Sequence, residues 1–289
     1  MVSKQEILGN EILKRIHIHN RNDGGVYTLT TGAQGSAKTS VLLSFTDYTI
    51  LNHSDEKIFW SECYEAPLQI FKLEENKYKF FAFKDLPIKF RDRNNKLEPL
   101  NLPVIRFNDF QDLYDKAETG IANVIFFGNR LIWMDFIRFL RNTGEWSHVF
   151  IDEFAEVCPA YQSGNMWKNI GLFANSILKD IRKCMINLHT NTQTAIGIDD
   201  RIVKQAMINI YLPGAIAIKS RRVKQKAIDN LKSSSKYGNE AYIEYSGKFG
   251  VTIFEDIYLP NTDKHIDIIC NGIEGEGKYN YFSSFQDSN

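Results

Sequence analysis

A short segment rich in small residues, Gly32–Ser40 (GAQGSAKTS), carries the strongest chemical signal in this sequence. It follows an apolar run, Val26–Thr31, and opens a segment of helical spacing that begins near Lys38. Strand, loop and helix in this order are typical of a phosphate-binding loop, in which backbone N–H groups at a helix N-terminus surround phosphate oxygens. Lys38 would reach the β and γ phosphates of ATP, and the hydroxyl of Thr39 would bind Mg²⁺. The predicted nucleotide-binding residues are Gly32, Ala33, Gln34, Gly35, Ser36, Ala37, Lys38, Thr39 and Ser40.

The loop departs from the pattern G-x-x-x-x-G-K-[ST] at one position, because Ala37 stands where the second glycine is expected. Alanine adds only a methyl group, and we interpret it as a tolerated variant. The alternative is a Gly/Ser-rich turn with an incidental lysine.

A second motif supplies carboxylates. The mainly apolar run His148–Ile151 predicts a buried strand, and Asp152 and Glu153 follow it directly. In a parallel sheet, these side chains would lie at the edge from which the phosphate-binding loop emerges. This Walker B pattern predicts that Asp152 binds Mg²⁺ and that Glu153 orients and deprotonates the water that attacks the γ phosphate. The alternative is that Asp152 caps the next helix.

A third strand, Cys184–His189, is followed by the polar residues Thr190, Asn191, Thr192 and Gln193. The amide of Gln193 could sense the γ phosphate. Alternatively, Gln193 is a turn residue that pairs with nearby backbone. His189 has no partner at metal-ligand spacing, and we interpret it as structural.

The elements that must position these residues alternate between strands and helices. Expected strands are Val26–Thr31, Lys57–Cys63, Tyr78–Phe83, Pro103–Phe107, Asn123–Phe127, His148–Ile151 and Cys184–His189, and expected helices are Lys38–Phe45, Leu131–Arg141, Met166–Lys183 and Arg221–Leu231. This alternation predicts an α/β fold with a mostly parallel sheet flanked by helices.

The C-terminal part of the chain has a different pattern. Two alternating runs, Glu240–Tyr245 and Val251–Ile257, flank Ser246–Gly250 and predict a β-hairpin. The residues after Gly272 are polar and Gly-rich, and we expect a flexible tail. The whole chain, residues 1–289, is expected to be one domain with its core at about residues 24–258.

The segment Lys84–Leu100 is long for a connection, whose median length is about 4–6 residues. It carries Arg91 and Arg93 among other basic residues, and it is either a functional loop or a solvated insertion.

Composition excludes several classes of protein. The 289 residues are 43% hydrophobic and 24% charged, which excludes a disordered or collagen-like chain. Thirty-five basic and thirty-five acidic residues give no net charge, so contact with nucleic acid would need a local basic patch.

Other features favour a cytoplasmic protein. The cysteines, Cys63, Cys158, Cys184 and Cys270, form no CxxC pair, which favours a reducing compartment. The first twenty residues are charged throughout, unlike a secretory signal. The most apolar window, Val124–Leu140, is interrupted by Asn129, Arg130, Asp135 and Arg138, so we expect no membrane-spanning segment.

With its three motifs, the chain resembles the FtsK–HerA superfamily of P-loop motors. More than a hundred residues separate Lys38 from Asp152, the Walker B strand ends in Asp-Glu, and Thr192-Gln193 matches the Thr-Gln sensor of that family. The resemblance extends from about Val26 to Ile257. It departs at Ala37 and at Thr194 and Ala195, where a proline often follows the sensor, and the chain has no room for an accessory DNA-guiding domain.

The resemblance implies a RecA-like core, a homo-oligomeric, usually hexameric ring, and ATP-driven movement of double-stranded DNA. The small size is similar to that of viral or plasmid packaging and conjugation ATPases, whose partners would be a capsid or a conjugation protein. In such a ring a neighbouring subunit supplies a cation to the phosphoryl-transfer transition state, and Arg221 and Arg222 are the candidates. They could instead belong to a solvated basic helix or, like the loop around Arg91 and Arg93, contact duplex DNA.

The sequence therefore predicts a Mg²⁺-dependent ATPase that translocates double-stranded DNA, with Lys38, Glu153, Gln193, Arg221 and Arg222 as catalytic residues. One alternative is a motor with protein cargo that resembles the Zot group. Another is a slow nucleotide-gated switch that exchanges interaction partners.

Overall fold

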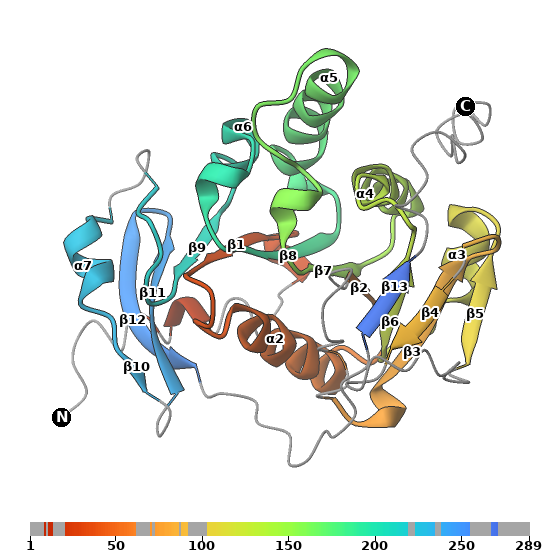
Figure 1. Ribbon diagram of the computed structural model, residues 1–289, viewed down its shortest axis with the longest axis horizontal. Helices are drawn as coiled ribbons and strands as arrows, with labels where there is room; N and C mark the ends of the chain where they lie inside the picture. Colours follow the sequence, from red (N-terminus) through yellow and green to blue (C-terminus); the bar gives the residue numbers. More distant parts are fainter. Residues whose placement is uncertain are drawn as a thin grey trace.

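The computed structural model describes residues 9, 11–13, 21–61, 70, 73–86, 88–91, 103–218, 223–234, 238–254 and 267–270. In this part of the chain, eleven strands form one twisted sheet in the order β10-β11-β9-β1-β8-β7-β2-β6-β3-β5, with β12 paired to β11 (Figure 1). The strands are β1 (Tyr27–Thr31), β2 (Lys57–Ser61), β3 (Tyr78–Phe83), β5 (Val104–Phe107), β6 (Ala122–Phe126), β7 (Ser147–Ile151), β8 (Ile186–Thr192), β9 (Ile208–Tyr211), β10 (Ser233–Ser234), β11 (Gly238–Tyr245) and β12 (Lys248–Phe254).

Eight neighbouring strands, from β9 to β5, are parallel to one another. Strands of a parallel sheet covered by helices are buried on both faces. All five residues of β6 (ANVIF) and of β7 (SHVFI) are buried. The predicted α/β fold with a mostly parallel sheet is confirmed.

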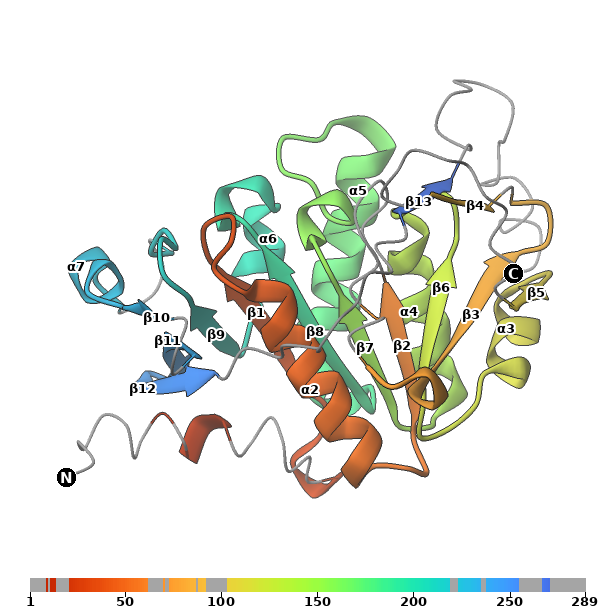
Figure 2. The ribbon, with the colours of Figure 1, turned by 60° about the horizontal axis from the view of Figure 1, so that its bottom comes forward.

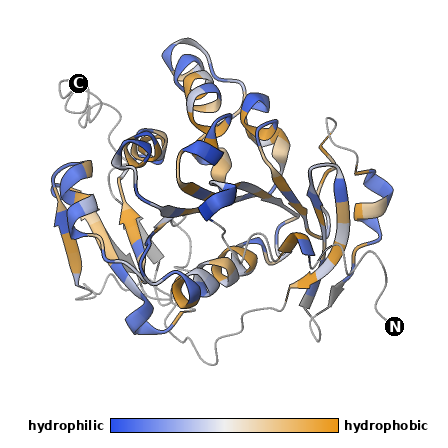
Figure 3. Cartoon of the chain, turned by 180° about the vertical axis from the view of Figure 1, so that it is seen from behind, coloured by the Kyte–Doolittle hydropathy of each residue, from blue (hydrophilic) through white to orange (hydrophobic). Residues whose placement is uncertain are grey.

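Helices cover both faces of this sheet. Figures 1 and 2 show α2 (Lys38–Asn52) on one face and α4 (Ile132–Thr143), α5 (Gly164–Phe173) and α6 (Asp200–Val203) on the other. Two further helices, α3 (Phe110–Lys116) and α7 (Gln225–Asp229), lie toward the two ends of the sheet. Hydrophobic and hydrophilic residues alternate around the flanking helices (Figure 3), because each helix buries only one side.

The predicted C-terminal hairpin is present, with a tighter turn than expected. β11 and β12 pair in antiparallel register from Asn239–Phe254 to Tyr245–Lys248. Ser246 and Gly247 alone connect them, both with positive φ, as in the two-residue turns that match strand twist. The expected five-residue turn was therefore wrong, since Lys248, Phe249 and Gly250 belong to the second strand.

Two other expectations need correction. The helix expected over Met166–Lys183 is α5 followed by a π-helical turn, Ala174–Leu178, and a separate 3₁₀ turn, Ile181–Lys183. The segment expected as one loop, Lys84–Leu100, contains strand β4 (Ile88–Arg91), which pairs with β13 (Asp267–Cys270) in a two-stranded sheet. That pairing joins segments about 180 residues apart, which local sequence patterns do not reveal.

The residues beyond 270, where a flexible tail is expected, lie outside the described part of the chain. Among the described residues, no helix has the length and apolar character needed to cross a membrane.

Candidate functional site

The three predicted motifs meet at one edge of the parallel sheet. β8 lies between β1 and β7, with Thr192 opposite Thr31 on one side and Thr190 opposite Ile151 on the other. The carboxyl end of β1 leads into the loop of residues 32–37, and that of β7 leads into Asp152. Figure 2 shows the β1–α2 loop at the edge of the sheet to which the parallel strands point. This edge is where ligands bind in parallel α/β sheets.

The loop between β1 and α2 is a compact turn at the N-terminus of a fifteen-residue helix. Its curvature requires Gly32, because a Cβ there would lie 2.3 Å from Ser36 Oγ and 2.8 Å from Leu212 Cβ. Gly35 and Ala37 both have positive φ, +78° and +65°. When residues of negative and positive φ alternate along a loop, successive backbone N–H groups point toward one side. These N–H groups form a concave site that binds anions. Ala37 therefore occupies a left-handed position that favours glycine.

The ammonium of Lys38 lies over this loop. Its Nζ donates hydrogen bonds to the carbonyl oxygens of Gly32 at 3.0 Å and of Ala33 at 2.9 Å. Ala33, Gln34 and Gly35 are exposed, so the loop is open to a ligand from solvent. A cation beside a helix N-terminus is suited to bind phosphate groups.

Thr39 and Asp152 come together from α2 and from the end of β7. The hydroxyl of Thr39 donates to the carboxylate of Asp152, 3.2 Å from each oxygen. The carboxylate is 7% exposed and does not cap a helix, so the alternative of a helix cap was wrong. A hydroxyl and a carboxylate that converge on one point are hard oxygen ligands of the kind Mg²⁺ prefers, so the two residues fit this ion.

Glu153 is held in an uncommon conformation beside them. Its φ is +48°, and its N–H donates a 2.9 Å hydrogen bond to Asn191 Oδ1. Its Oε1 accepts a 2.7 Å hydrogen bond from the hydroxyl of Thr192. Burial raises the pKa of Glu153, and the hydrogen bond from Thr192 opposes that rise. Two residues of β8 therefore fix both the backbone and the carboxylate of Glu153.

Arg130, just before α4, is a site residue that sequence reasoning missed. It is 5% exposed, and its guanidinium donates to the carbonyl oxygen of Asp152, to Ser61 Oγ at 3.3 Å and to Glu156 Oε2 at 2.7 Å. It thus anchors the turn that carries Asp152 and Glu153. A signal was present, because a charged residue within the most apolar window of a chain must find partners when buried.

Of the remaining residues considered from the sequence, the structure describes Gln193 and His189. Gln193 is exposed and directly follows β8, at the edge that carries the loop and Asp152. Its neighbour Thr192, not Gln193, contacts the Walker B residues. Arg221 and Arg222 lie outside the described residues. His189 stacks on Phe150 with ring centroids 4.9 Å apart, in accord with the structural interpretation.

Comparisons in sequence give no match, either with a protein-family model or with a curated protein. Solved structures match the fold. The genome packaging NTPase B204 from Sulfolobus turreted icosahedral virus 2 superimposes with a TM-score of 0.52 in its complex with ATP-gammaS, at 12% identity, covering 82% of this chain and 99% of B204. Its complex with AMPPCP gives a TM-score of 0.52, 13% identity, and coverage of 82% and 100%.

At this identity the comparison concerns the fold alone. The chain therefore has the fold of a RecA-like P-loop NTPase.

Proposed function

We propose that the protein is a Mg²⁺-dependent ATPase that couples hydrolysis to the translocation of double-stranded DNA, as a homo-oligomeric ring of the FtsK–HerA type in the cytoplasm. The observation that carries the ATPase is the contact of Thr192 with Glu153 across the edge at which Lys38 and Asp152 also lie. A structural carboxylate would not need to be held at the open side of a phosphate-binding loop.

The loop amides and Lys38 bind the β and γ phosphates of ATP. Thr39 and Asp152 hold Mg²⁺, which neutralises charge on the phosphate oxygens when it is bound. Glu153 orients a water molecule and takes its proton as the water oxygen bonds to the γ phosphorus. The bond from that phosphorus to the bridging oxygen breaks, and ADP and phosphate leave. Burial, which raises the pKa of Glu153, makes its carboxylate a stronger base.

The proposal of double-stranded DNA as the substrate is supported by the sequence motifs and by the fold comparison. The motifs resemble those of a family of DNA motors, and the structurally similar B204 is a genome packaging NTPase. With no net charge on the chain, duplex DNA must be held by local basic residues. Gln193 serves as the γ-phosphate sensor, Arg221 or Arg222 as the cation supplied to a neighbouring subunit, and a capsid or conjugation protein as the partner.

Steady-state ATP hydrolysis with Mg²⁺, with and without linear duplex DNA and over a range of salt concentrations, tests this function. We expect turnover that duplex DNA raises several-fold at low salt, with the stimulation lost as salt weakens phosphate contacts. Lys38→Ala should abolish turnover. Lys79→Ala, which removes an exposed lysine paired with Glu118, should not change it.

Two other outcomes would contradict parts of the proposed function. Turnover that duplex DNA does not change at any salt concentration would contradict the DNA motor and favour protein cargo. Nucleotide binding without turnover would contradict the ATPase and favour a nucleotide-gated switch.

A further inference from the structure

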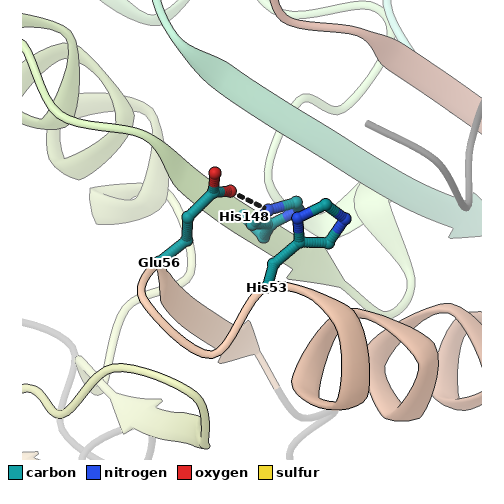
Figure 4. A group of neighbouring side chains, drawn as sticks. All are labelled: His53, Glu56 and His148. Atoms are coloured by element: carbon teal, nitrogen blue, oxygen red, sulfur yellow. Dashed lines mark hydrogen bonds and ion pairs between the residues drawn. The ribbon is translucent and has the colours of Figure 1, made fainter. Parts of the chain in front are cut away.

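Three side chains of types that can ligate a metal lie together in Figure 4. They lie at the end of α2 and the start of β7, at the edge of the sheet opposite the phosphate-binding loop. His53 directly follows α2, Glu56 directly precedes β2, and His148 is the second residue of β7. β2 and β7 are parallel neighbours, with Ile58 opposite His148. This register places the turn between α2 and β2 beside the start of β7.

The cluster is tight and largely closed to water. One ligand atom from each residue lies within 4.8 Å of the other two. His148 Nε2 is 2.6 Å from Glu56 Oε2, and the rings of His53 and His148 are 5.4 Å apart between centroids. Glu56 and His148 are each 2% exposed, whereas His53 is half-buried at the surface. An ion could therefore enter past His53.

We propose that His53, Glu56 and His148 form a binding site for a divalent transition-metal ion of the zinc class. Two imidazoles and one carboxylate, with water as the fourth ligand, are a known ligand set for zinc. Mg²⁺ prefers oxygen ligands alone, so this site selects a different ion from the one held by Thr39 and Asp152.

Metal binding requires the ring proton of His148 to be on Nδ1, because Nε2 becomes a metal ligand. His148 Nε2 and Glu56 Oε2 are within hydrogen-bond distance, and the imidazole donates to the carboxylate when its proton is on Nε2. A metal bonded to both atoms would replace this hydrogen bond: the proton on Nε2 would leave to solvent and one would be taken up at Nδ1, so the imidazole would stay neutral with no net release of protons. Burial lowers the pKa of His148, and the hydrogen bond and charge of Glu56 oppose this shift.

The surroundings fix the carboxylate of Glu56. Arg21 lies 2.8 Å from its Oε1, and its Oε2 is turned to His148. Arg21 is about half exposed and also pairs with Asp55, so its charge is shared and partly screened by water. Such outer contacts orient metal ligands.

The metal site would join α2 and β7, whose opposite ends lead to the residues proposed to bind nucleotide and Mg²⁺. α2 begins at Lys38 and ends at Asn52, one residue before His53. β7 runs from Ser147, beside His148, to Ile151, beside Asp152. A metal would therefore fasten the far ends of α2 and β7 together and stabilise the folded state.

The test is titration of Co²⁺ into metal-free protein that carries no histidine tag and no nucleotide, followed by visible absorption. We expect one equivalent of Co²⁺ to give the absorption of a four-coordinate nitrogen and oxygen site, and Zn²⁺ to displace it. Zn²⁺ should also raise the melting temperature.

Substitutions of the proposed ligands, compared with a control substitution, test which residues bind the metal. His53→Ala and Glu56→Gln should each weaken Co²⁺ binding by about a hundredfold, since even outer contacts account for about 10–100-fold. Asp200→Asn, which alters a carboxylate of α6 at 71% exposure, paired with Lys204, should bind as the wild type does. His53 is half-buried, so its variant is expected to fold, and circular dichroism checks this.

Folded wild-type protein that binds no Co²⁺, or variants that bind it as the wild type does, would overturn the metal site. The site does not depend on the proposed ATPase. Lys38→Ala should bind Co²⁺ normally, so failure of the metal site and failure of the ATPase are distinguishable.

Discussion

The hydroxyl of Thr192, the last residue of β8, donates a 2.7 Å hydrogen bond to Oε1 of Glu153 on the turn that follows β7. The contact crosses between neighbouring parallel strands and fixes the carboxylate beside Asp152 and Thr39. Asn191, one residue earlier, holds the N–H of Glu153. The strand between the two nucleotide-binding strands therefore positions the proposed base, and Thr192 is a positioning residue.

Replacement of Thr192 by valine removes this hydroxyl and keeps the shape of the side chain. A hydrogen bond to a charged group is worth about 1.5–3 kcal/mol, so Thr192→Val should lower kcat by about tenfold to a hundredfold. ATP affinity should not change. Thr192→Ser keeps the hydroxyl and should retain most of the turnover. A valine variant that turns over ATP like the wild type would show that Glu153 needs no such support.

Replacement of Glu153 by glutamine removes the base and leaves a side chain of equal size. Loss of a general base costs about 10²–10⁴-fold in rate, so Glu153→Gln should lose most turnover and still bind ATP. Binding of a fluorescent ATP analogue and steady-state hydrolysis measure the two effects separately. Unchanged turnover in this variant would remove Glu153 from the mechanism.

Replacement of Arg130 by lysine breaks the planar set of contacts with Asp152, Ser61 and Glu156. Lysine cannot reproduce that geometry, so Arg130→Lys should lower the free energy of unfolding by about 2–4 kcal/mol and slow ATP turnover. Urea denaturation and steady-state hydrolysis measure these changes.

The control for this variant is Arg138→Lys in α4, the helix that follows Arg130. Arg138 pairs with Asp135 and with the carbonyl of Asn169, away from the site, at 28% exposure. We expect a loss of about 0–1 kcal/mol and normal turnover. Equal effects of the two substitutions would mean that Arg130 has no special relation to Asp152.

Replacement of Ala37 tests the departure from the glycine pattern. Its φ of +65° costs an alanine about 1 kcal/mol, and part of the gain from glycine is offset by the greater entropy of the unfolded chain. Ala37→Gly should therefore raise the free energy of unfolding by up to about 1 kcal/mol.

Ala37→Val serves as the opposite variant, because branching at Cβ disfavours positive φ further. It should lower the free energy of unfolding by about 1–2 kcal/mol and weaken ATP binding. If the valine variant were as stable as the glycine variant, the left-handed backbone at this position would be ruled out.

The sequence alone predicted the parts of the site that are contiguous in the chain. The loop Gly32–Ser40 and the strand that ends at Asp152 each carry their own signal, because a strand, a loop and a helix start are local features. Alternation of such features also predicted the parallel sheet, whose carboxyl edge had to bring Thr39 and Asp152 together.

Only the tertiary structure decided which residues support those motifs. Arg130 reaches Asp152 although β2 lies between their strands, and Thr192 contacts Glu153. His148 meets Glu56 across ninety-two positions of sequence. Such contacts depend on strand order and register, which are set by burial of the whole sheet, and no local pattern of residues carries that information.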